Sequence, residues 1–450
     1  MTNIIIPRLI GGFPEWLPEE KIKEQWVMDV IRRHYSRYGF VPIETPAVER
    51  REVLTSKGGN EKEIYVLGRL QAENDHDREE AAELALHFDL TVPLARYVAQ
   101  HYRDLAFPFR RYQMQKVWRG ERPQSGRSRE FYQCDIDVIG DGELSLMTDA
   151  EIPSIIYHIF HELQIGPFVI HINNRKILQG YFGSIGISDE NHAVAMRIVD
   201  KLAKIGVGQV VSELKSAIGI SEEVATEIVR FIDMKVPFDS LEECLEEHSD
   251  SALFHEGVSE LKTVIDGIRA LGVPDESFRV NLGIARGLDY YTGTVYETIL
   301  VNHPGIGSVC SGGRYENLAS SFIDRKLPGV GISIGVTRLL SRLFNAGILK
   351  AEVATTAPVL ITSMDPTRML DYLRLASVLR GAGINVEVYL ETKKLGLQLK
   401  YANRKGFSFA VIAGSNEFDK SAVLLKNLKT GEQQEIAVAD LIDALKVGLG

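Results

Sequence analysis

The sequence predicts an α+β protein in which helices flank an antiparallel sheet, with a helical insertion and a C-terminal α/β module. Residues 108–119 and 130–139 are rich in aromatic and β-branched residues, and a segment of turn-forming residues separates them, which predicts an antiparallel hairpin. Residues 185–275 have helical patterning, and strand and helix patterns alternate from residue 358 onward. An antiparallel core argues against nucleotide sites of the Rossmann or P-loop type, and neither glycine motif occurs between a strand and a helix.

The composition is that of a soluble globular protein. The chain has 450 residues, 45% hydrophobic and 25% charged, which suits two to four domains. No apolar run reaches the roughly 18–20 residues that span a bilayer, and the N-terminus lacks the pattern of a signal peptide. The cysteines Cys134, Cys244 and Cys310 are far apart and form no CxxC pair. This spacing argues against disulfides and a cysteine zinc site, and it predicts a cytoplasmic protein.

Two basic segments interrupt a chain whose formal net charge is −10. Residues 110–130 carry seven Lys and Arg against two Glu, and residues 391–430 carry eight Lys and Arg against three acidic residues. Each segment is either an ordinary solvated face or a contact surface for nucleic acid. A tRNA is large enough to touch both segments.

The N-terminal part is expected to contain a helix and a short strand before the hairpin. Residues 20–38 carry apolar side chains at helical spacing. Residues 39–46 contain two prolines, which place a short strand at a sheet edge or an interface. Further on, Asp89 and Thr91 are candidate site residues, and the alternative interpretation is that Thr91 is the N-cap of a helix that has Pro93 near its start.

Changes of pattern divide the chain into segments. The insertion has candidate helix stops at Gly206, Gly208 and Gly219. The predicted segments are a first core part at 1–184, the insertion at 185–275, a second core part at 276–347, a linker at 348–357 and a small binding module at 358–450.

Strand patterns return after the insertion. They cover 278–301 and 306–315, and a glycine-spaced strand at 329–335 leads into a helix over 335–347. In the C-terminal module, Asp365 is expected to cap a helix that follows the first strand. The elements there form a βαβαβ unit with a mixed or parallel sheet, with strands at 358–363, 385–390 and 408–413 and a second helix near 393–405.

The hairpin carries residues suited to activation of a carboxylate by ATP. That reaction needs cations for the phosphates, an aromatic face for adenine and carboxylates for an ammonium group. Arg119 ends one strand and can bind phosphate through two hydrogen bonds, and Phe131 can stack on a base. Gln133, Asp135 and Asp137 share one strand face. The alternative interpretation is that these are surface polar residues on a two-sided hairpin.

Four further clusters each give only weak evidence for a functional site, but their order along the chain forms a pattern. Asp89 and Thr91 alternate near a helix start. Residues 285–293 (ARGLDYYTG) suit either a packed hairpin or a pocket with one cation and two hydroxyls. Residues 311–315 (SGGRY) form a tight backbone passage, and Arg338 lies one turn into a helix, where the helix dipole adds to its attraction for anions.

Together these segments resemble the signature motifs of class II aminoacyl-tRNA synthetases. GFVPIETPAVE at 39–49 resembles motif 1, VWRGERPQSGRSREFYQCDIDV at 117–138 resembles motif 2, and GVGISIGVTRLL at 329–340 resembles motif 3. The resemblance implies the class II synthetase catalytic core, which is an antiparallel sheet flanked by helices. It also implies that the proline of motif 1, Pro46, lies at a homodimer interface.

Two further stretches resemble the histidyl-tRNA synthetases specifically. They are RGLDYYTGTVYE at 286–297 and SGGRYENL at 311–318. The resemblance runs from about residue 5 to the C-terminus and is weakest in the insertion. It implies that the module at 358–450 binds the anticodon.

The resemblance also implies a role for each matching residue. The expected histidine-binding residues are Asp89, Leu90, Thr91, Arg119, Gln133, Asp137, Arg286, Tyr290, Tyr291 and Tyr315. The expected ATP-binding residues are Arg119, Glu121, Phe131 and Arg338, and those facing the tRNA acceptor end are Gln124, Arg127 and Arg129. Arg286 and Arg119 would be catalytic. Asp137 and Tyr291 would bind the imidazole nitrogens, since neutral imidazole has one donor and one acceptor.

The implied reaction is ATP-dependent, AMP-forming ligation of histidine to its tRNA. The histidine carboxylate attacks the α-phosphorus of ATP, pyrophosphate leaves, and the terminal tRNA ribose hydroxyl then attacks histidyl-adenylate. Magnesium would accompany ATP, and no permanently bound cofactor, zinc or membrane partner is implied.

The chain departs from the family pattern at a few positions, and other functions stay open. Thr337 stands where an acid usually precedes the motif 3 arginine, and Ser128 stands where an aromatic residue is common. The alternatives are a ligase for another amino acid, a tRNA-binding protein with an inactive centre, and a histidine-binding regulatory subunit of the ATP phosphoribosyltransferase of histidine biosynthesis. Such regulatory paralogues typically lack the C-terminal module and the intact RGLDYY stretch, which this chain has.

Overall fold

The structure is a computed structural model, and it describes residues 5–56, 63–68, 83–122, 127–284 and 291–449. Contacts within the chain define two compact units, which we describe separately: Met1–Pro14 with Val27–Leu349, and Glu15–Trp26 with Lys350–Gly450. The division after Leu349 falls inside the segment predicted as a linker.

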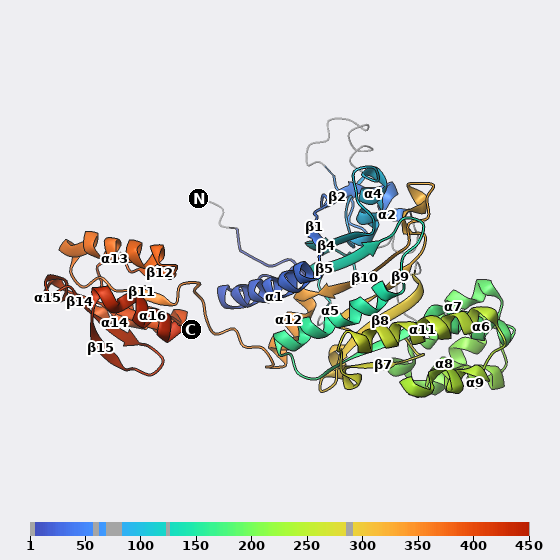
Figure 1. Cartoon of the computed structure of the whole chain (residues 1–450). Helices are drawn as coiled ribbons and strands as arrows, with labels where there is room; N and C mark the ends of the chain where they lie inside the picture. Colours follow the sequence, from blue (N-terminus) through green and yellow to red (C-terminus); the bar gives the residue numbers. More distant parts are fainter. Residues whose placement is uncertain (1–4, 57–62, 69–82, 123–126, 285–290, 450) are drawn as a thin grey trace. The chain divides into compact units, whose positions relative to one another are not determined.

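A large, mostly antiparallel sheet forms the centre of the first unit (Figure 1). Its strands are β1 (Val41–Pro42), β4 (Phe109–Trp118), β5 (Glu130–Ile139), β6 (Phe168–Asn174), β7 (Phe278–Val280), β8 (Tyr291–Leu300), β9 (Cys310–Tyr315) and β10 (Gly329–Gly335). Within the described part of the chain, the order is β1-β4-β5-β10-β9-β8-β6-β7. β1 pairs in parallel with β4, and β7 with β6, and the other pairs are antiparallel. This architecture confirms the predicted α+β class, with the short strand at a sheet edge.

The predicted hairpin lies inside this sheet. β4 and β5 pair from Phe109 with Ile139 to Trp118 with Glu130. The glycine-spaced strand β10 pairs with β5 on one side and β9 on the other. Gly331 lies opposite Asp137, and a Cβ at Gly331 would come within 2.3 Å of the Asp137 carboxylate. The missing side chain therefore makes room for a buried polar group of the neighbouring strand.

Helices cover the sheet. α1 (Pro18–Arg37) confirms the helix predicted over 20–38, and its Tyr35 hydroxyl donates to the Cys134 carbonyl of β5 at 2.9 Å. α5 (Met147–Leu163) contacts β9 and β10, and α12 (Val336–Asn345) follows β10 directly, as predicted. A second, two-stranded sheet pairs β2 (Val48–Arg50) with β3 (Leu84–Leu86), and α2 (Arg51–Thr55) follows β2.

The helix α4 (Thr91–Gln100) begins one residue earlier than predicted. Thr91 is its first residue and Leu90 is the N-cap, so the prediction of Thr91 as the cap was wrong. The Asp89 carboxylate accepts a hydrogen bond from the backbone N–H of Val92 at 3.2 Å. Asp89 therefore satisfies one of the N–H groups that the first helical turn leaves without a partner.

The insertion is helical, as predicted. Following α6 (Arg175–Ser184), its helices are α7 (Asp189–Val199), α8 (Leu202–Ile218), α9 (Glu222–Ile232), α10 (Leu241–Glu246) and α11 (Ala252–Ala270). Gly219 ends α8 with a φ of 72°, a left-handed conformation that favours glycine. Gly206 has a non-helical backbone conformation that divides α8 into two helical stretches, which confirms a stop there, whereas Gly208 lies within the second stretch, so the predicted stop at Gly208 was wrong.

The C-terminal unit has a mixed sheet with the order β12-β11-β13-β14-β15. Its strands are β11 (Val359–Ile361), β12 (Val386–Val388), β13 (Phe409–Ile412), β14 (Ala422–Asn427) and β15 (Gln433–Ala437), and its helices are α13 (Met369–Gly381), α14 (Leu395–Lys405), α15 (Ser415–Asp419) and α16 (Leu441–Leu449). β11 is parallel to both β12 and β13, whereas β14 and β15 continue antiparallel. Asp365 accepts a hydrogen bond from the Thr367 N–H, which confirms it as a cap, although of a 3₁₀ turn that leads into α13.

Candidate active site

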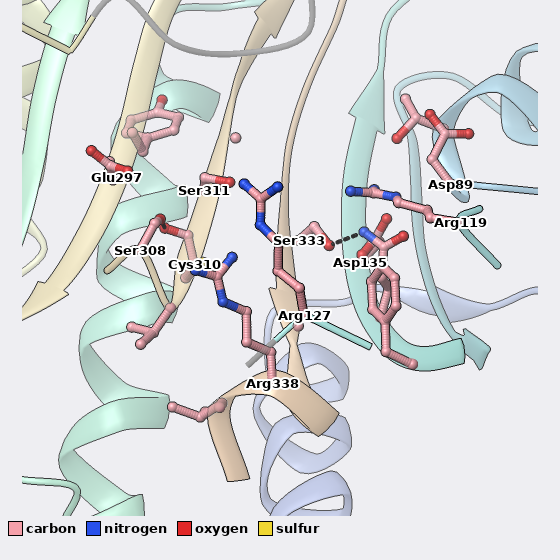
Figure 2. Close-up of a pocket in the computed structure, with 18 of the residues that line it drawn as sticks. Asp89, Arg119, Arg127, Asp135, Glu297, Ser308, Cys310, Ser311, Ser333 and Arg338 are labelled. Atoms are coloured by element: carbon pink, nitrogen blue, oxygen red, sulfur yellow. Dashed lines mark hydrogen bonds between the residues drawn. The ribbon is translucent and has the colours of Figure 1, made fainter. Parts of the chain in front are cut away.

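A pocket of about 630 Å³ opens on the large sheet, between β5, β8, β9 and β10 and the start of α12. The predicted site residues that line it are Asp89, Thr91, Arg119, Glu121, Arg127, Phe131, Gln133, Tyr291 and Arg338. Figure 2 shows part of this lining, with acidic and cationic side chains brought together from distant segments. The fold therefore gathers both core parts of the chain around one pocket.

Arginines supply the positive charge of the pocket. Arg119 donates from Nε to the Phe88 carbonyl at 3.0 Å, and its guanidinium lies 5.1 Å from the centre of the Phe131 ring. Arg127 forms an ion pair with Glu121 at 3.0 Å. Figure 2 shows the guanidinium groups of Arg127 and Arg338 extending into the pocket, with Arg119 and Asp89 side by side on the other wall. Guanidinium groups in such positions suit the binding of phosphate oxygens.

The polar residues of β5 are buried. Gln133, Asp135 and Asp137 are 7%, 2% and 4% exposed, so the alternative of surface residues on a two-sided hairpin was wrong. Gln133 and Asp135 line the pocket together with Asp89. The Gln133 amide donates to the Ser333 hydroxyl of β10 at 2.6 Å, which is the dashed contact in Figure 2.

Asp137 lies deeper and has partners for both carboxylate oxygens. Arg111 of β4, which is fully buried, forms an ion pair with Oδ2 at 2.5 Å. The Tyr315 hydroxyl of β9 donates to Oδ1 at 2.9 Å. Both contacts favour the ionised carboxylate. Asp137 and Tyr315 are absent from the pocket lining, so the structure places them behind its wall.

Burial raises the pKa of Asp89 and Asp135, two of the carboxyl groups that line the pocket. The pKa of Asp89 rises to about 6, although the Val92 N–H, Arg119 and Arg111 oppose the rise. The pKa of Asp135 rises to about 7, opposed by Arg111 and by a hydrogen bond from Ser333. A cationic ligand would lower both pKa values, because it stabilises the charged form of each group.

Comparison with known proteins identifies the family. The sequence profile described as histidyl-tRNA synthetase matches residues 12–339, and that of an anticodon binding domain matches residues 359–447. A histidine–tRNA ligase from a Nostoc species is 50% identical over 447 residues, which cover 97% of this chain and 96% of that protein. The chain belongs to the histidyl-tRNA synthetase family.

Solved structures agree with this membership. The crystal structure of the Nostoc histidyl-tRNA synthetase matches with a TM-score of 0.90 and 48% identity, over 98% of this chain and 99% of that chain. A Bacillus halodurans protein described as an ATP phosphoribosyltransferase regulatory subunit/histidyl-tRNA synthetase matches with a TM-score of 0.71 but 19% identity, over 89% of this chain and 97% of that chain. The second likeness shows a shared fold and nothing more.

In this member of the histidyl-tRNA synthetase family, some predicted site residues lie outside the pocket wall. Leu90 is fully buried under α4. Arg129 donates from Nε to the Glu121 carbonyl at 2.9 Å and so supports the base of the motif 2 loop. The residues Gln124, Arg286 and Tyr290 lie outside the described part of the chain.

Three residues that the structure brings to the site were not predicted from the sequence. Arg111 belongs to one of the two basic segments, and extending the hairpin register from Trp118 and Glu130 places it opposite Asp137. Ser333 contacts Gln133, and its position in the glycine-spaced strand gave no sign of this role. Glu297 lines the pocket from β8, and its place at the end of the RGLDYYTGTVYE stretch was the available signal.

Neither a membrane helix nor a metal-binding cluster is found among the described residues. No helix there is long and apolar enough to cross a bilayer. No group of three or more His, Cys, Asp or Glu side chains in the described ranges is arranged to hold a metal ion. The three cysteines are free thiols, and those of Cys134 and Cys310 are buried.

Proposed function

We propose that the chain is a histidine–tRNA ligase, which activates L-histidine with ATP and transfers it to the 3′ end of histidine tRNA. The observation that carries this proposal is 50% identity with a histidine–tRNA ligase over nearly the whole length of both proteins. The pocket supports it, because carboxylates suit the ammonium group of an amino acid and arginines suit the phosphates of ATP.

The carboxylate part of the pocket would bind histidine. Asp89, Thr91 and Gln133, with the backbone at Leu90, would hold the amino group and its neighbouring atoms. Tyr291, which lines the pocket, would bind one imidazole nitrogen. Asp137 would bind the other from behind the pocket wall, where Arg111 and Tyr315 hold its carboxylate, and Tyr290 and Tyr315 would line the ring site. A site with such buried polar groups rejects apolar isosteres, because these would leave the polar groups unpaired.

The arginine part would bind ATP as its magnesium complex. Arg119 would contact the α-phosphate and the histidine carboxylate, and Arg338 would contact the γ-phosphate. Phe131 would stack on adenine, and Glu121 would accept a hydrogen bond from it. The Arg119 guanidinium lies 5.1 Å from the centre of the Phe131 ring, so the proposed phosphate and adenine contacts are neighbours in the pocket.

The chemistry would be an in-line attack of the histidine carboxylate on the α-phosphorus. Arg119 and Arg286 would stabilise the charge that builds up on the phosphoryl oxygens as pyrophosphate leaves. No protein base is required, because the attacking carboxylate is already ionised. Positioning and charge stabilisation therefore account for the acceleration.

The tRNA would be bound at two places. Gln124, Arg127 and Arg129, in and beside the motif 2 loop, would face the acceptor end. The segment 359–447, which matches the anticodon binding domain profile, would bind the anticodon. We also propose a homodimer, with Pro46 of motif 1 at its interface.

Histidine-dependent exchange of pyrophosphate into ATP, followed by charging of total tRNA, tests this proposal. We expect both activities, with charging confined to histidine tRNA. Exchange without charging would limit the protein to adenylate formation. Histidine binding without exchange would overturn the ligase proposal and favour a regulatory role.

A further inference from the structure

Three buried acceptor atoms of the pocket lack a hydrogen-bond partner among the described residues. They are Oδ2 of Asp89, Oε1 of Gln133 and Oδ1 of Asp135, and all three side chains line the same pocket. Their exposed fractions are 2%, 7% and 2%. An unpaired buried acceptor costs about 1–3 kcal/mol, so three on one pocket wall indicate a site that is completed by a ligand with several donors.

Ser333 orients two of these acceptors. Its hydroxyl accepts a hydrogen bond from the Gln133 amide nitrogen at 2.6 Å, which leaves the amide oxygen available. The same hydroxyl hydrogen-bonds to the Asp135 carboxyl group, and Oδ1 of that group has no partner in the part of the chain that the structure describes. Ser333 lies directly opposite Asp135 in the pairing of β10 with β5. A single hydroxyl on the neighbouring strand therefore sets the directions of both side chains.

Asp137 is not equivalent to Asp135, although both belong to the same strand face. Arg111 and Tyr315 already occupy both oxygens of Asp137. Asp89 lies close enough to Asp135 for their charges to interact, and Arg111 lies near both. Among the described residues near these three carboxylates, Arg111 is fully buried and is paired with Asp137, whereas Arg119, which lines the pocket, lies near Asp89.

A primary ammonium group matches the three acceptors in number and charge. It has three N–H donors and one positive charge, and two of the three acceptors belong to carboxylates. Hydrogen bonds between charged partners are about twice as strong as neutral ones. A hydroxyl or an amide has too few donors for all three atoms.

We propose that Asp135 is a further histidine-binding residue, which completes with Asp89 and Gln133 a three-acceptor site for the α-ammonium group. This inference rests on the proposed function. Ser333 is then a positioning residue, which acts on the substrate through Gln133 and Asp135.

The test compares ligands that keep or lack the ammonium group. Dissociation constants are measured by calorimetry for L-histidine, histamine and 3-(imidazol-4-yl)propionate, with the wild-type chain and with Asp135→Asn. We expect the substitution to weaken the binding of histidine and histamine by at least about tenfold, which is what losing one charged hydrogen bond produces. The dissociation constant of the propionate, which has no ammonium group, should change by less than about threefold.

Matched variants separate binding from folding. Asp141→Asn makes the same chemical change just after β5, on a partly exposed residue paired with Tyr102 and Arg325, and it should leave all three constants unchanged. Ser333→Ala should weaken histidine and histamine with the same ligand dependence, and it tests the proposal if Asp135→Asn fails to fold.

Each outcome has a distinct meaning. Unchanged histidine affinity in folded Asp135→Asn, or an equal loss for the propionate, would overturn the assignment of Asp135 to the ammonium group. Absence of histidine binding and of pyrophosphate exchange in the wild-type chain would instead overturn the proposed function.

Discussion

The Thr337 hydroxyl accepts a hydrogen bond from the backbone N–H of Tyr132 at 2.9 Å. Thr337 is buried in the first turn of α12, and Tyr132 belongs to β5. The contact joins the segment that resembles motif 3 to the one that resembles motif 2. Arg338, which follows Thr337, and Phe131, which precedes Tyr132, both line the pocket. Thr337 therefore connects the start of α12 to β5 through this hydrogen bond. Because its side chain is uncharged, it adds no charge beside Arg338.

Replacing Thr337 with valine should loosen this junction. The Tyr132 N–H would lose its acceptor, and we expect a loss of about 1–2 kcal/mol in the free energy of unfolding. The KM for ATP in pyrophosphate exchange should rise more than the KM for histidine, because Arg338 is the adjacent residue. Thr337→Ser keeps the hydroxyl and is the control. A valine variant with wild-type stability and kinetics would show that this hydrogen bond does not stabilise the contact between α12 and β5.

The buried pair of Arg111 and Asp137 should behave as a unit. Arg111→Met leaves a buried carboxylate without its cation and should cost about 3 kcal/mol of unfolding free energy. The double variant Arg111→Met with Asp137→Asn should recover part of that loss, since no charge remains unpaired. Urea unfolding of the wild type, Arg111→Met, Asp137→Asn and the double variant gives the coupling free energy between the two residues. Additive effects of the two substitutions would contradict a coupled pair.

Gly331 should tolerate no side chain. A Cβ there would meet both the Asp137 carboxylate and the Ile136 carbonyl at 2.3 Å, and backbone cannot move away as a flexible side chain can. We expect Gly331→Ala to destabilise the chain by about 3 kcal/mol and to weaken histidine binding. Gly305→Ala is the control, because its Cβ would meet no atom of the described residues within 4 Å. Equal melting temperatures of the two variants would disprove the predicted clash.

The stability of the ligand-free chain should depend on pH through Asp135 and Asp89. Their pKa values in the folded chain, about 7 and about 6, lie above the ordinary value of 3.8. The folded state therefore binds more protons than the unfolded state between these values, so stability falls as pH rises from about 4 to about 7.

Melting curves from pH 5 to 8 measure this dependence. We expect a decrease of about 4 kcal/mol that Asp135→Asn reduces, since the amide does not ionise. Saturating histidine should also flatten the curve, because its ammonium group would stabilise the ionised carboxylates. An unchanged slope in Asp135→Asn would mean that Asp135 is not a source of the dependence.

Arg286, which lies outside the described residues, has a kinetic prediction. If it stabilises charge at the α-phosphorus, Arg286→Ala should lower the rate of adenylate formation by at least about a hundredfold while the histidine dissociation constant changes little. Single-turnover kinetics and equilibrium binding separate the two effects. Equal losses in both would refute the assigned role.

Much of the fold could be predicted because local patterns carry it. Aromatic and β-branched residues around a loop of turn formers predicted β4 and β5, and helical spacing predicted α1 and the helices of the insertion. Predictions failed where a local signal has two structural uses. Thr91 is a good capping residue, but the chain enters α4 one residue earlier and Asp89 accepts the hydrogen bond.

For the candidate site as well, the sequence determined one part of the arrangement and the tertiary structure decided the rest. The sequence by itself determined which residue types are present, their alternation on β5, and the family, since the motifs occur in a specific order. The tertiary structure decided that Asp137 is paired with Arg111 and Tyr315, while Asp89, Gln133 and Asp135 each keep an acceptor that has no partner among the described residues. The reason is physical: strand alternation fixes the face of a side chain, but burial and partners depend on the strands that pack beside it. Here those neighbours are β4, β9 and the glycine-spaced β10.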